Sequence, residues 1–283
     1  MRLRRYVTEA GRRLRVAGVD SPHLCASLLV CRLLEITRLN CIVDADRELT
    51  EEQISLLDQL VLRRINGEPL AYILGQKEFF SRNFYITPDT LIPRPETELL
   101  VETALALLPG SRRLFFADIG SGSGCIGITL ALERELWRGM LLDISEKALE
   151  VAKSNARRLN AASSLAYVQA DMRWTPVRSC SCDLVVSNPP YIGESETARI
   201  MDEVLRFEPR EALFSPLDGT AHLTAVIRLA ARALKKNGVA LVEHGAEQGA
   251  RARALFEGAG SFRGIKTFRD PAGLERCTCA VKP

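Results

Sequence analysis

The stretch Leu114-Phe115-Phe116-Ala117-Asp118-Ile119-Gly120-Ser121-Gly122-Ser123-Gly124 decides the fold of this chain. The short apolar run Leu114–Ile119 predicts a buried strand, and the glycines after it predict a tight turn into a helix. Glycines in such a turn let the backbone approach a ligand closely, and a helix start offers N–H groups to it. Dinucleotide-binding folds share this pattern, and a merely tight turn would also use glycine. The stretch therefore predicts an α/β sheet and suggests a ligand loop.

Strands and helices alternate on both sides of this stretch. The further strands are expected at Met140–Leu142, Leu165–Val168, Asp183–Val186 and Val239–Val242, with helices at Glu146–Leu159 and His222–Leu234. Asn237-Gly238 has the composition of a helix end. Phe262–Phe268 and Cys277–Val281 are typical of a closing antiparallel pair. Alternating elements with continuous apolar strands favour a doubly wound, mainly parallel sheet covered by helices.

The chain changes character twice before this region. Residues 1–75 have apolar residues at helical spacing, with helix-start signals at Ser21-Pro22 and Thr50–Glu52, and predict a small all-helical domain. Residues 76–95 predict a β-hairpin linker, with strands at 78–80 and 83–87 separated by Ser81-Arg82. Residues 96–283 then form the α/β domain, which begins with a helix at Leu99–Leu108.

Composition limits the classes of protein to consider. The 283 residues are 47% hydrophobic and 26% charged, which is ordinary for a soluble globular protein. No stretch approaches the roughly 20 apolar residues of a membrane span, and the basic N-terminus lacks the apolar core of a signal peptide. A cytoplasmic location without membrane contact is expected. The net charge of +3 is too small to indicate a nucleic-acid binder, although the arginines of residues 1–40 form either a basic patch or a solvated helix face.

Two Cys-x-Cys pairs, Cys180/Cys182 and Cys277/Cys279, raise the question of zinc. Structural zinc sites usually use two to four intervening residues, whereas one intervening residue in a strand points both thiols to the same face. Packing of small apolar side chains is therefore the favoured interpretation, and no metal is expected. His23, His222 and His244 share no motif and are expected to be surface or core residues.

Polar side chains follow successive strands at their carboxyl ends, where open α/β sheets bind ligands. Asp143 ends the second strand, and its carboxylate can accept both ribose hydroxyls of a nucleoside. Asp171 and Met172 follow the third strand, where they would meet the adenine. A single aspartate at a strand end is unremarkable, but three successive strands with such residues favour a nucleoside site.

Asn188-Pro189-Pro190-Tyr191 follows the fourth strand and is the most specific feature of the sequence. A planar amide or amino nitrogen is hard to methylate because its lone pair is delocalised. The Asn188 side-chain oxygen and the Pro189 carbonyl can accept hydrogen bonds from both of its N–H groups, so the lone pair builds toward an incoming methyl carbon. The prolines stiffen the loop, and Tyr191 supplies an aromatic face for the flat group. These residues predict a methyltransferase acting on nitrogen.

With these motifs the chain resembles the protein-(glutamine-N5) methyltransferases that modify class-1 peptide chain release factors. The resemblance covers nearly the whole chain: the helical N-terminal region and the motifs Ile73–Phe79, Ile92–Glu98, Asp118–Gly124, Asn188–Ile192, Glu208–Leu213 and Gly273–Arg276. Residues 93–98, Pro-Arg-Pro-Glu-Thr-Glu, are the narrowest of these, because enzymes acting on a ribosomal protein typically differ after the arginine. Ser121 and Ser123 stand where threonine is common, and Met172 where an aromatic residue is frequent.

The resemblance implies a seven-stranded Rossmann-like class I methyltransferase sheet and S-adenosyl-L-methionine as cofactor, with S-adenosyl-L-homocysteine as product. It implies cofactor contacts from Gly120, Ser121, Gly122, Ser123 and Gly124, and from Asp143, Asp171, Met172 and Asn188. It further implies that Asn188, Pro189, Pro190 and Tyr191 hold the glutamine of a Gly-Gly-Gln loop. Arg94 and Glu96 either line the substrate cleft or form a structural pair at a helix start.

Three other functions remain open at this point. A nucleic-acid amino-methyltransferase faces the same chemistry with a flipped base, but it usually carries a recognition domain or a strongly basic surface. A second alternative is a methyltransferase acting on a ribosomal-protein glutamine, a sister of the release-factor enzymes. A non-enzymatic adaptor that keeps only the glycine loop would not need the intact Asn188–Tyr191 motif. The favoured partners are class-1 release factors, and direct nucleic-acid binding is not expected.

Overall fold

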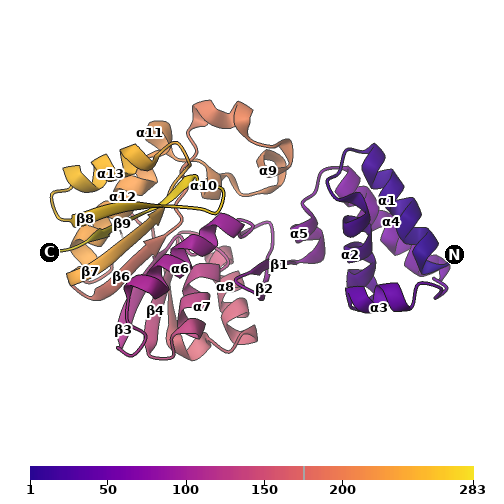
Figure 1. Cartoon of the computed structure of the whole chain (residues 1–283), viewed down its shortest axis with the longest axis horizontal. Coiled ribbons are helices and arrows are strands. Elements are labelled where there is room, and N and C mark those ends of the chain that lie inside the picture. Colours follow the sequence, from indigo (N-terminus) through magenta and orange to yellow (C-terminus); the bar gives the residue numbers. More distant parts are fainter. Residues whose placement is uncertain (175) are drawn as a thin grey trace. The chain divides into compact units, whose positions relative to one another are not determined.

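A seven-stranded sheet forms the centre of the larger of two compact units (Figure 1). The computed structural model describes residues 1–174 and 176–283, and the counts below refer to these residues. The strand order is β5-β4-β3-β6-β7-β9-β8. The strands are β3 (Leu114–Ile119), β4 (Trp137–Asp143), β5 (Leu165–Gln169), β6 (Cys182–Ser187), β7 (Leu234–Glu243), β8 (Arg263–Arg269) and β9 (Glu275–Val281). β9 runs antiparallel to β7 and β8, and the other neighbouring pairs are parallel. The predicted class I methyltransferase fold is confirmed.

The order of the strands places a switch point between β3 and β6. The chain builds outward from β3 through β4 to β5 and then returns to place β6 on the other side of β3. Loops that leave β3 and β6 at their carboxyl ends therefore diverge, and a crevice opens between them. The glycine loop follows β3 and the Asn188–Tyr191 loop follows β6. The topology thus brings the two strongest motifs of the sequence to one place.

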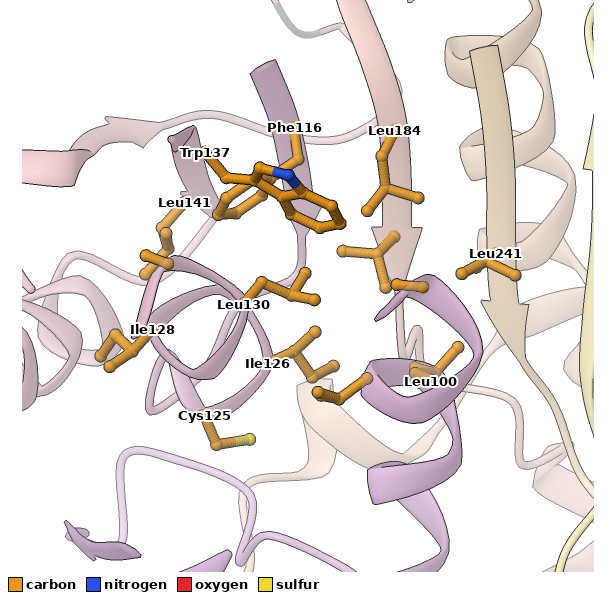
Figure 2. Packing of buried hydrophobic residues seen from close by; sticks show 14 of the residues in the cluster. Leu100, Phe116, Cys125, Ile126, Ile128, Leu130, Trp137, Leu141, Leu184 and Leu241 are labelled. Atoms are coloured by element: carbon orange, nitrogen blue, oxygen red, sulfur yellow. The ribbon is translucent and has the colours of Figure 1, made fainter. Parts of the chain in front are cut away.

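Helices cover both faces of the sheet because its strands alternate between two apolar clusters. Phe116 of β3 packs in the cluster with α6 (Glu98–Leu107), α7 (Cys125–Glu133) and α8 (Glu146–Arg158). Ala117 and Ile119 pack on the opposite face with α12 (Ala221–Ala233) and α13 (Gly249–Gly258). Figure 2 shows the first cluster, in which side chains of α6 and α7 point toward those of the strands. This burial on both faces fixes the strand ends that carry the motifs.

A close contact between neighbouring strands explains one glycine of this core. Phe116 and Gly139 are paired in the register of β3 and β4. A Cβ atom on Gly139 would lie 2.1 Å from the Phe116 ring. The buried aromatic ring therefore occupies the space that a side chain at position 139 would need.

The smaller unit consists of Met1–Gln76 together with Met201–Phe207. Its first helices are α1 (Leu3–Val16), α2 (Pro22–Leu34), α3 (Arg38–Val43), α4 (Glu51–Ile65) and α5 (Leu70–Leu74). Thr50 begins α4 with a capping box to Gln53, whereas the Ser21 side chain makes no capping hydrogen bond to α2. The separate short helix α9 (Asp202–Phe207) belongs to this unit, and its Glu203 forms an ion pair with Arg64 at 2.7 Å. No local sequence pattern indicates that a segment after the Asn188–Tyr191 loop packs with the N-terminal helices.

The basic character of α1 is largely compensated inside the smaller unit. Arg2 and Arg4 pair with Asp46, Arg12 with Glu9, and Arg13 with Asp58. These pairs favour the interpretation of a solvated helix face over that of a concentrated basic patch.

The predicted hairpin forms, but its turn lies one residue earlier than expected. β1 (Gln76–Phe79) and β2 (Arg82–Tyr85) are joined by Phe80 and Ser81, both with positive φ, and not by Ser81-Arg82. Two successive residues with positive φ match the twist of a two-residue hairpin turn. The Asn155 side chain of α8 holds both the N–H and the carbonyl of Tyr85, and Glu98 accepts the Phe80 N–H. The hairpin from Lys77 onward is accordingly part of the larger unit, which consists of Lys77–Ile200 and Glu208–Pro283.

Three short segments connect the remaining elements. The 3-10 helix η1 (Pro95–Thr97) precedes α6, η2 (Ala162–Ser164) precedes β5, and η3 (Glu194–Arg199) follows the Asn188–Tyr191 loop. The short helices α10 (Arg210–Leu213) and α11 (Pro216–Gly219) lie between α9 and α12. The prediction that Asn237-Gly238 ends a helix is wrong: α12 ends at Ala233, and Asn237 lies within the bounds of β7 with φ of 61°. There its N–H donates to the Lys282 carbonyl.

The cysteines of the strands pack in the core. Cys277 and Cys279 lie in the same apolar cluster, as their alternating positions predicted, while Cys182 is buried on the other face and Cys180 is exposed. In the described part of the chain, no group of three or more His, Cys, Asp or Glu side chains is placed to hold a metal ion. Nor does any described helix have the length and apolar character to cross a membrane.

Candidate functional site

A pocket opens at the carboxyl ends of β3, β4, β5 and β6, beside the switch point of the sheet. Predicted site residues that line it are Gly120, Gly122, Asp143, Asp171, Met172 and Asn188, together with Pro190. Its other walls come from the segment after the hairpin, from the loop around α10 and from α12, and include Leu91, Pro209, Glu211 and His222. The topology thus brings residues that are far apart in the sequence, from Asp89 to His222, to the wall of one pocket.

The glycine loop combines open backbone on the pocket side with close packing behind it. Gly120, Gly122 and Gly124 have φ of 69°, 54° and 79°. A Cβ atom on Gly122 would meet nothing within 4 Å, whereas one on Gly124 would lie 2.8 Å from Ile128 and 3.0 Å from Leu141. Gly122 therefore keeps the pocket open, and Gly124 permits the packing of α7 against β4.

Several amides of this loop already have acceptors within the protein. Gly120 and Ser121 donate to the Leu142 carbonyl, and Gly124 donates to Ser121. Ser121 and Ser123 are buried and do not line the pocket. The loop is thus a preformed backbone turn tied to the end of β4.

Asp143 closes this arrangement from the next strand. Its carboxylate accepts the Gly122 N–H at 2.8 Å and the Ser145 N–H at 2.9 Å. Burial raises the pKa of Asp143, and the hydrogen bonds from Ser145, Gly122 and Ile144 oppose that shift. A partly buried carboxylate with remaining acceptor capacity beside a pocket is suited to a pair of hydroxyl groups.

Asp171 lies at the pocket but is already engaged. Both of its oxygens accept hydrogen bonds from the Arg173 guanidinium, and this interaction is the main cause of its lowered pKa. β5 ends at Gln169, two residues before it. Met172 borders the pocket near Gly120, with its terminal methyl 3.7 Å from the position of a Cβ there. Met172 is the more available of the two for an apolar contact.

The Asn188–Tyr191 loop is braced from two sides. Ile192 exchanges backbone hydrogen bonds with Leu213 and Ser215, and the Gln248 side-chain amide donates to the Tyr191 carbonyl at 2.8 Å. Gly219 approaches the same carbonyl so closely that its Cβ would lie 2.2 Å away. The loop therefore has a fixed backbone before any ligand binds, as a preorganised site requires.

The two expected acceptors of the loop are available. The Asn188 side-chain nitrogen donates to the Thr97 hydroxyl at 3.0 Å, which turns the side-chain oxygen the other way. Across residues 1–174 and 176–283, neither that oxygen nor the Pro189 carbonyl accepts a hydrogen bond. Asn188 lines the pocket, whereas Pro189 lines neither this pocket nor the cavity beside Tyr191.

Tyr191 borders a second cavity, which Ile192, Glu196, Gly245, Gln248 and Arg276 also line. Burial raises the pKa of the Tyr191 phenol, so it remains neutral. Because Asn188 and Pro190 line the first pocket and Tyr191 the second, the loop forms part of the wall of both.

Arg94 and Glu96 have separate surroundings. Arg94 pairs with Glu208 at 2.6 Å and not with Glu96, so the structural pair expected at the helix start does not form. Glu208 also accepts the Ile92 N–H and is 1% exposed in its side chain. Neither Arg94 nor Glu96 lines the two cavities. The ion pair fastens the segment before α6 to the segment before α10.

Several residues of the site escaped the sequence analysis. His222 lines the pocket, with Nδ1 at 2.9 Å from the Ser215 hydroxyl, and burial lowers its pKa. His244 is buried between the Gly245 carbonyl and Thr278. Thr97 reaches Asn188, and the fully buried Glu243 ends the neighbouring strand. Only the position of Glu243 at a strand end was visible in the sequence, and its burial was not.

The residues present fit S-adenosyl-L-methionine. Gly122 leaves space where a side chain would intrude, Asp143 offers a carboxylate, and Leu142, Ile144 and Met172 offer apolar contacts. Within the described residues, the buried Ser121 hydroxyl and one oxygen of Asp118 lack hydrogen-bond partners beneath this loop. A pocket with mainly apolar walls and a few polar groups is suited to an adenine nucleoside with a charged tail.

Comparisons with known proteins cover both units. Residues 6–75 match the model of the PrmC N-terminal domain, and residues 95–215 match that of the methyltransferase small domain. A release factor glutamine methyltransferase of Nitratidesulfovibrio vulgaris is 45% identical over 97% of this chain and 93% of its own length. Proteins of the same name from Neisseria gonorrhoeae and Koribacter versatilis are 39% and 36% identical, over 91% and 100% of this chain and 92% and 99% of their own lengths.

Proposed function

Since the chain belongs to the release factor glutamine methyltransferases and is a methyltransferase enzyme, we propose that it methylates N5 of the glutamine in the Gly-Gly-Gln motif of class-1 peptide chain release factors. The methyl donor is S-adenosyl-L-methionine and the product is S-adenosyl-L-homocysteine. The observation that supports the proposal is the braced Asn188–Tyr191 loop: Asn188 lines the pocket, and its side-chain nitrogen is held by Thr97 so that its oxygen is left as an acceptor.

The proposal gives the pocket at the carboxyl ends of the strands to the cofactor. Asp143 takes the ribose hydroxyls, Met172 and the neighbouring apolar residues take the adenine, and the backbone from Gly120 to Gly124 passes close to the tail. Asp171 contributes to the same wall through its link to Arg173. The cofactor supplies a methyl group on a sulfonium, which makes it an electrophile toward nitrogen.

The loop supplies what the acceptor nitrogen lacks. The Asn188 oxygen and the Pro189 carbonyl accept hydrogen bonds from the two N–H groups of the glutamine amide, so its lone pair is directed away from them. With the cofactor bound, its methyl group would pass from the sulfur to this nitrogen, and the nitrogen would release a proton to water. Positioning is the main contribution, and holding reacting atoms near ~3–3.5 Å is worth several kcal/mol. Pro190 and Tyr191 confine the flat amide.

The smaller unit is assigned to recognition of the release factor away from its glutamine. The family comparison supports this role, because residues 6–75 match the model of the PrmC N-terminal domain. The unit contributes no residue to the two cavities described for the larger unit. In this proposal the smaller unit determines the affinity for the release factor and takes no part in the methyl-transfer step.

Mass spectrometry after incubation with a release factor and S-adenosyl-L-methionine tests the proposal. We expect one added methyl group on the glutamine side chain of the Gly-Gly-Gln motif. A release factor with that glutamine replaced by alanine is the matched control and should gain none. Double-stranded DNA, ribosomal RNA and ribosomal proteins are the competing substrates, and preferential methylation of any of them would contradict the assignment.

A further inference from the structure

Asn188 and Glu243 occupy corresponding positions on neighbouring strands. β6 and β7 are parallel, and Ser187 is paired with Val242. The next residue along the chain is therefore Asn188 just after β6 and Glu243 at the end of β7. Thr97, from the 3-10 helix η1, reaches this same edge, because its hydroxyl accepts the Asn188 side-chain N–H.

Glu243 is an unusual residue for such a place. It is 1% exposed, and among the described residues neither carboxyl oxygen forms a hydrogen bond of standard geometry. Burying a carboxyl group without hydrogen-bond partners is unfavourable, so its presence calls for a physical reason. The Thr97 hydroxyl lies close enough to Glu243 to lower the pKa of this carboxyl, against the larger effect of burial.

A hydroxyl group by itself cannot choose how an amide is turned. The Thr97 hydroxyl can accept from the Asn188 nitrogen or donate to the Asn188 oxygen, since it has one hydrogen and free lone pairs. Only the first arrangement directs the Asn188 oxygen toward the acceptor nitrogen. Something must therefore engage the Thr97 hydrogen from the other side.

We propose that the Glu243 carboxylate, acting through the Thr97 hydroxyl, fixes the Asn188 side chain with its oxygen toward the substrate amide. A carboxylate can only accept, so it takes the Thr97 hydrogen and leaves the Thr97 oxygen as an acceptor for Asn188. A protonated Glu243 can donate to Thr97, which then donates to the Asn188 oxygen and turns the amide the wrong way. Glu243 and Thr97 are positioning residues, and the inference rests on the proposed role of Asn188.

The charges around Glu243 set the pH at which this orientation holds. Burial raises its pKa to about 8, and Glu96 adds to the shift, while Arg276 and Arg94 oppose it. The phenol of Tyr191 and the thiols of Cys125 and Cys277 also face this carboxyl, and each of these three groups has a raised pKa itself. The fraction of molecules with ionised Glu243 therefore increases as pH rises through about 8. The fraction in which the Asn188 oxygen is turned toward the substrate increases with it.

Four variants of the full chain test the positioning role, with a release factor and S-adenosyl-L-methionine as substrates. Thr97→Val removes the hydroxyl at constant shape, Thr97→Ser restores it, and Glu243→Gln replaces the acceptor-only group by one that can donate. Thr129→Val is the matched control, because Thr129 is buried in α7 and its hydroxyl lacks a partner in the described residues. The readouts are kcat, both KM values, the cofactor Kd and the pH profile of kcat between 6 and 9.

We expect kcat to fall about tenfold or more in Thr97→Val, in line with the loss of a buried hydrogen bond. Thr97→Ser should recover to within about twofold of the wild type, and the cofactor Kd should not change. Glu243→Gln should lose the rise of kcat around pH 8, and Thr129→Val should match the wild type.

Near-normal kcat in Thr97→Val, equal impairment of Thr97→Ser, or an unchanged pH rise in Glu243→Gln would each overturn the inference. If Thr97→Val does not fold, the pH profile of Glu243→Gln decides the question. Absence of glutamine methylation by the wild type would instead refute the proposed function, so the two failures are distinguishable.

Discussion

Asp143 accepts the Gly122 N–H at 2.8 Å, so the end of β4 holds the glycine loop that follows β3. One carboxylate thereby shapes the backbone that the cofactor would pass and faces the pocket itself. The glycine loop and the strand-end aspartate, which the sequence suggested as separate parts of the site, are linked by this hydrogen bond. Several consequences of this arrangement can be measured.

Replacement of Asp143 by alanine should weaken cofactor binding about 10- to 100-fold, because a hydrogen bond to a charged group is worth roughly 1.5–3 kcal/mol. Isothermal titration calorimetry with S-adenosyl-L-homocysteine measures the change. Asp171→Ala is the comparison, and we expect a loss of only a few-fold, since the Asp171 carboxylate is held by Arg173. A larger loss from Asp171 than from Asp143 would reverse the assignment of the ribose carboxylate.

Gly122→Ala should reduce cofactor affinity more than it reduces stability. Its positive φ makes the new side chain strained by about 1–2 kcal/mol, and the Cβ would enter the pocket side of the loop. Gly18→Ala is the matched control, because Gly18 has φ of 75°, a Cβ there would meet nothing within 4 Å, and it lies in the smaller unit. Both variants should lose similar stability in thermal melts, while only Gly122→Ala raises the cofactor Kd. Equal Kd values in the two would show that the loop is merely a turn.

Gly139→Ala should destabilise the larger unit by about 1–3 kcal/mol, the usual cost of overpacking a core. The new methyl group would overlap the Phe116 ring, which is fully buried. Urea unfolding measures the loss, and Phe116→Leu combined with Gly139→Ala should recover part of it. If the double variant recovers no stability, the destabilisation by Gly139→Ala does not come from overlap with the Phe116 ring.

Arg94→Ala should lower stability because it leaves the buried Glu208 carboxylate with the Ile92 N–H as its remaining partner. Removing one member of a buried pair costs up to about 3–5 kcal/mol, and the partial exposure of Arg94 reduces this figure. A cycle with Glu208→Ala separates the pair from the single residues. If Arg94 also contacts substrate, Arg94→Ala raises the KM for the release factor more than Glu208→Ala does, and equal KM values would assign it a structural role only.

Unfolding stability should fall between about pH 5 and pH 8. Burial raises the pKa of Asp118 to about 7 and that of Glu243 to about 8, so the folded chain retains two protons that the unfolded chain has already released. Because the folded state binds more protons in this window, stability decreases as pH rises through it. Asp118→Asn should flatten the decrease in denaturant titrations at several pH values. An equally steep decrease in that variant would remove Asp118 from the explanation.

The positions of the strand ends could be read from the sequence because local patterns determine them. Leu114–Ile119 is a strand with the bounds expected, and Asp143 and Asn188 end up at one edge of the sheet. The links between motifs could not be read in this way. Thr97 and Asn188 are 91 residues apart, and Arg94 and Glu208 are 114 apart, so only the folded chain brings them together.

Errors arose where tertiary packing overrides local preference. Asn237-Gly238 has the composition of a helix end, yet β7 begins at Leu234 because that residue fits the core. The hairpin turn uses Phe80, a residue with no preference for positive φ, because Glu98 binds its N–H and Phe79 is buried beside it. α9 joins the N-terminal helices through Glu203, a contact that no local pattern signals.

Single-turnover methyl transfer by Asn188→Ala tests the central claim, that two oxygens of this loop hold the acceptor nitrogen, most directly. The variant is mixed with a release factor and S-adenosyl-L-methionine, and the methylated glutamine is quantified by mass spectrometry beside a calorimetric cofactor Kd. We predict that transfer falls by at least about 100-fold, as for other preorganised polar groups at reaction centres, while the Kd changes little. Transfer at near-normal rates by this variant would contradict the account.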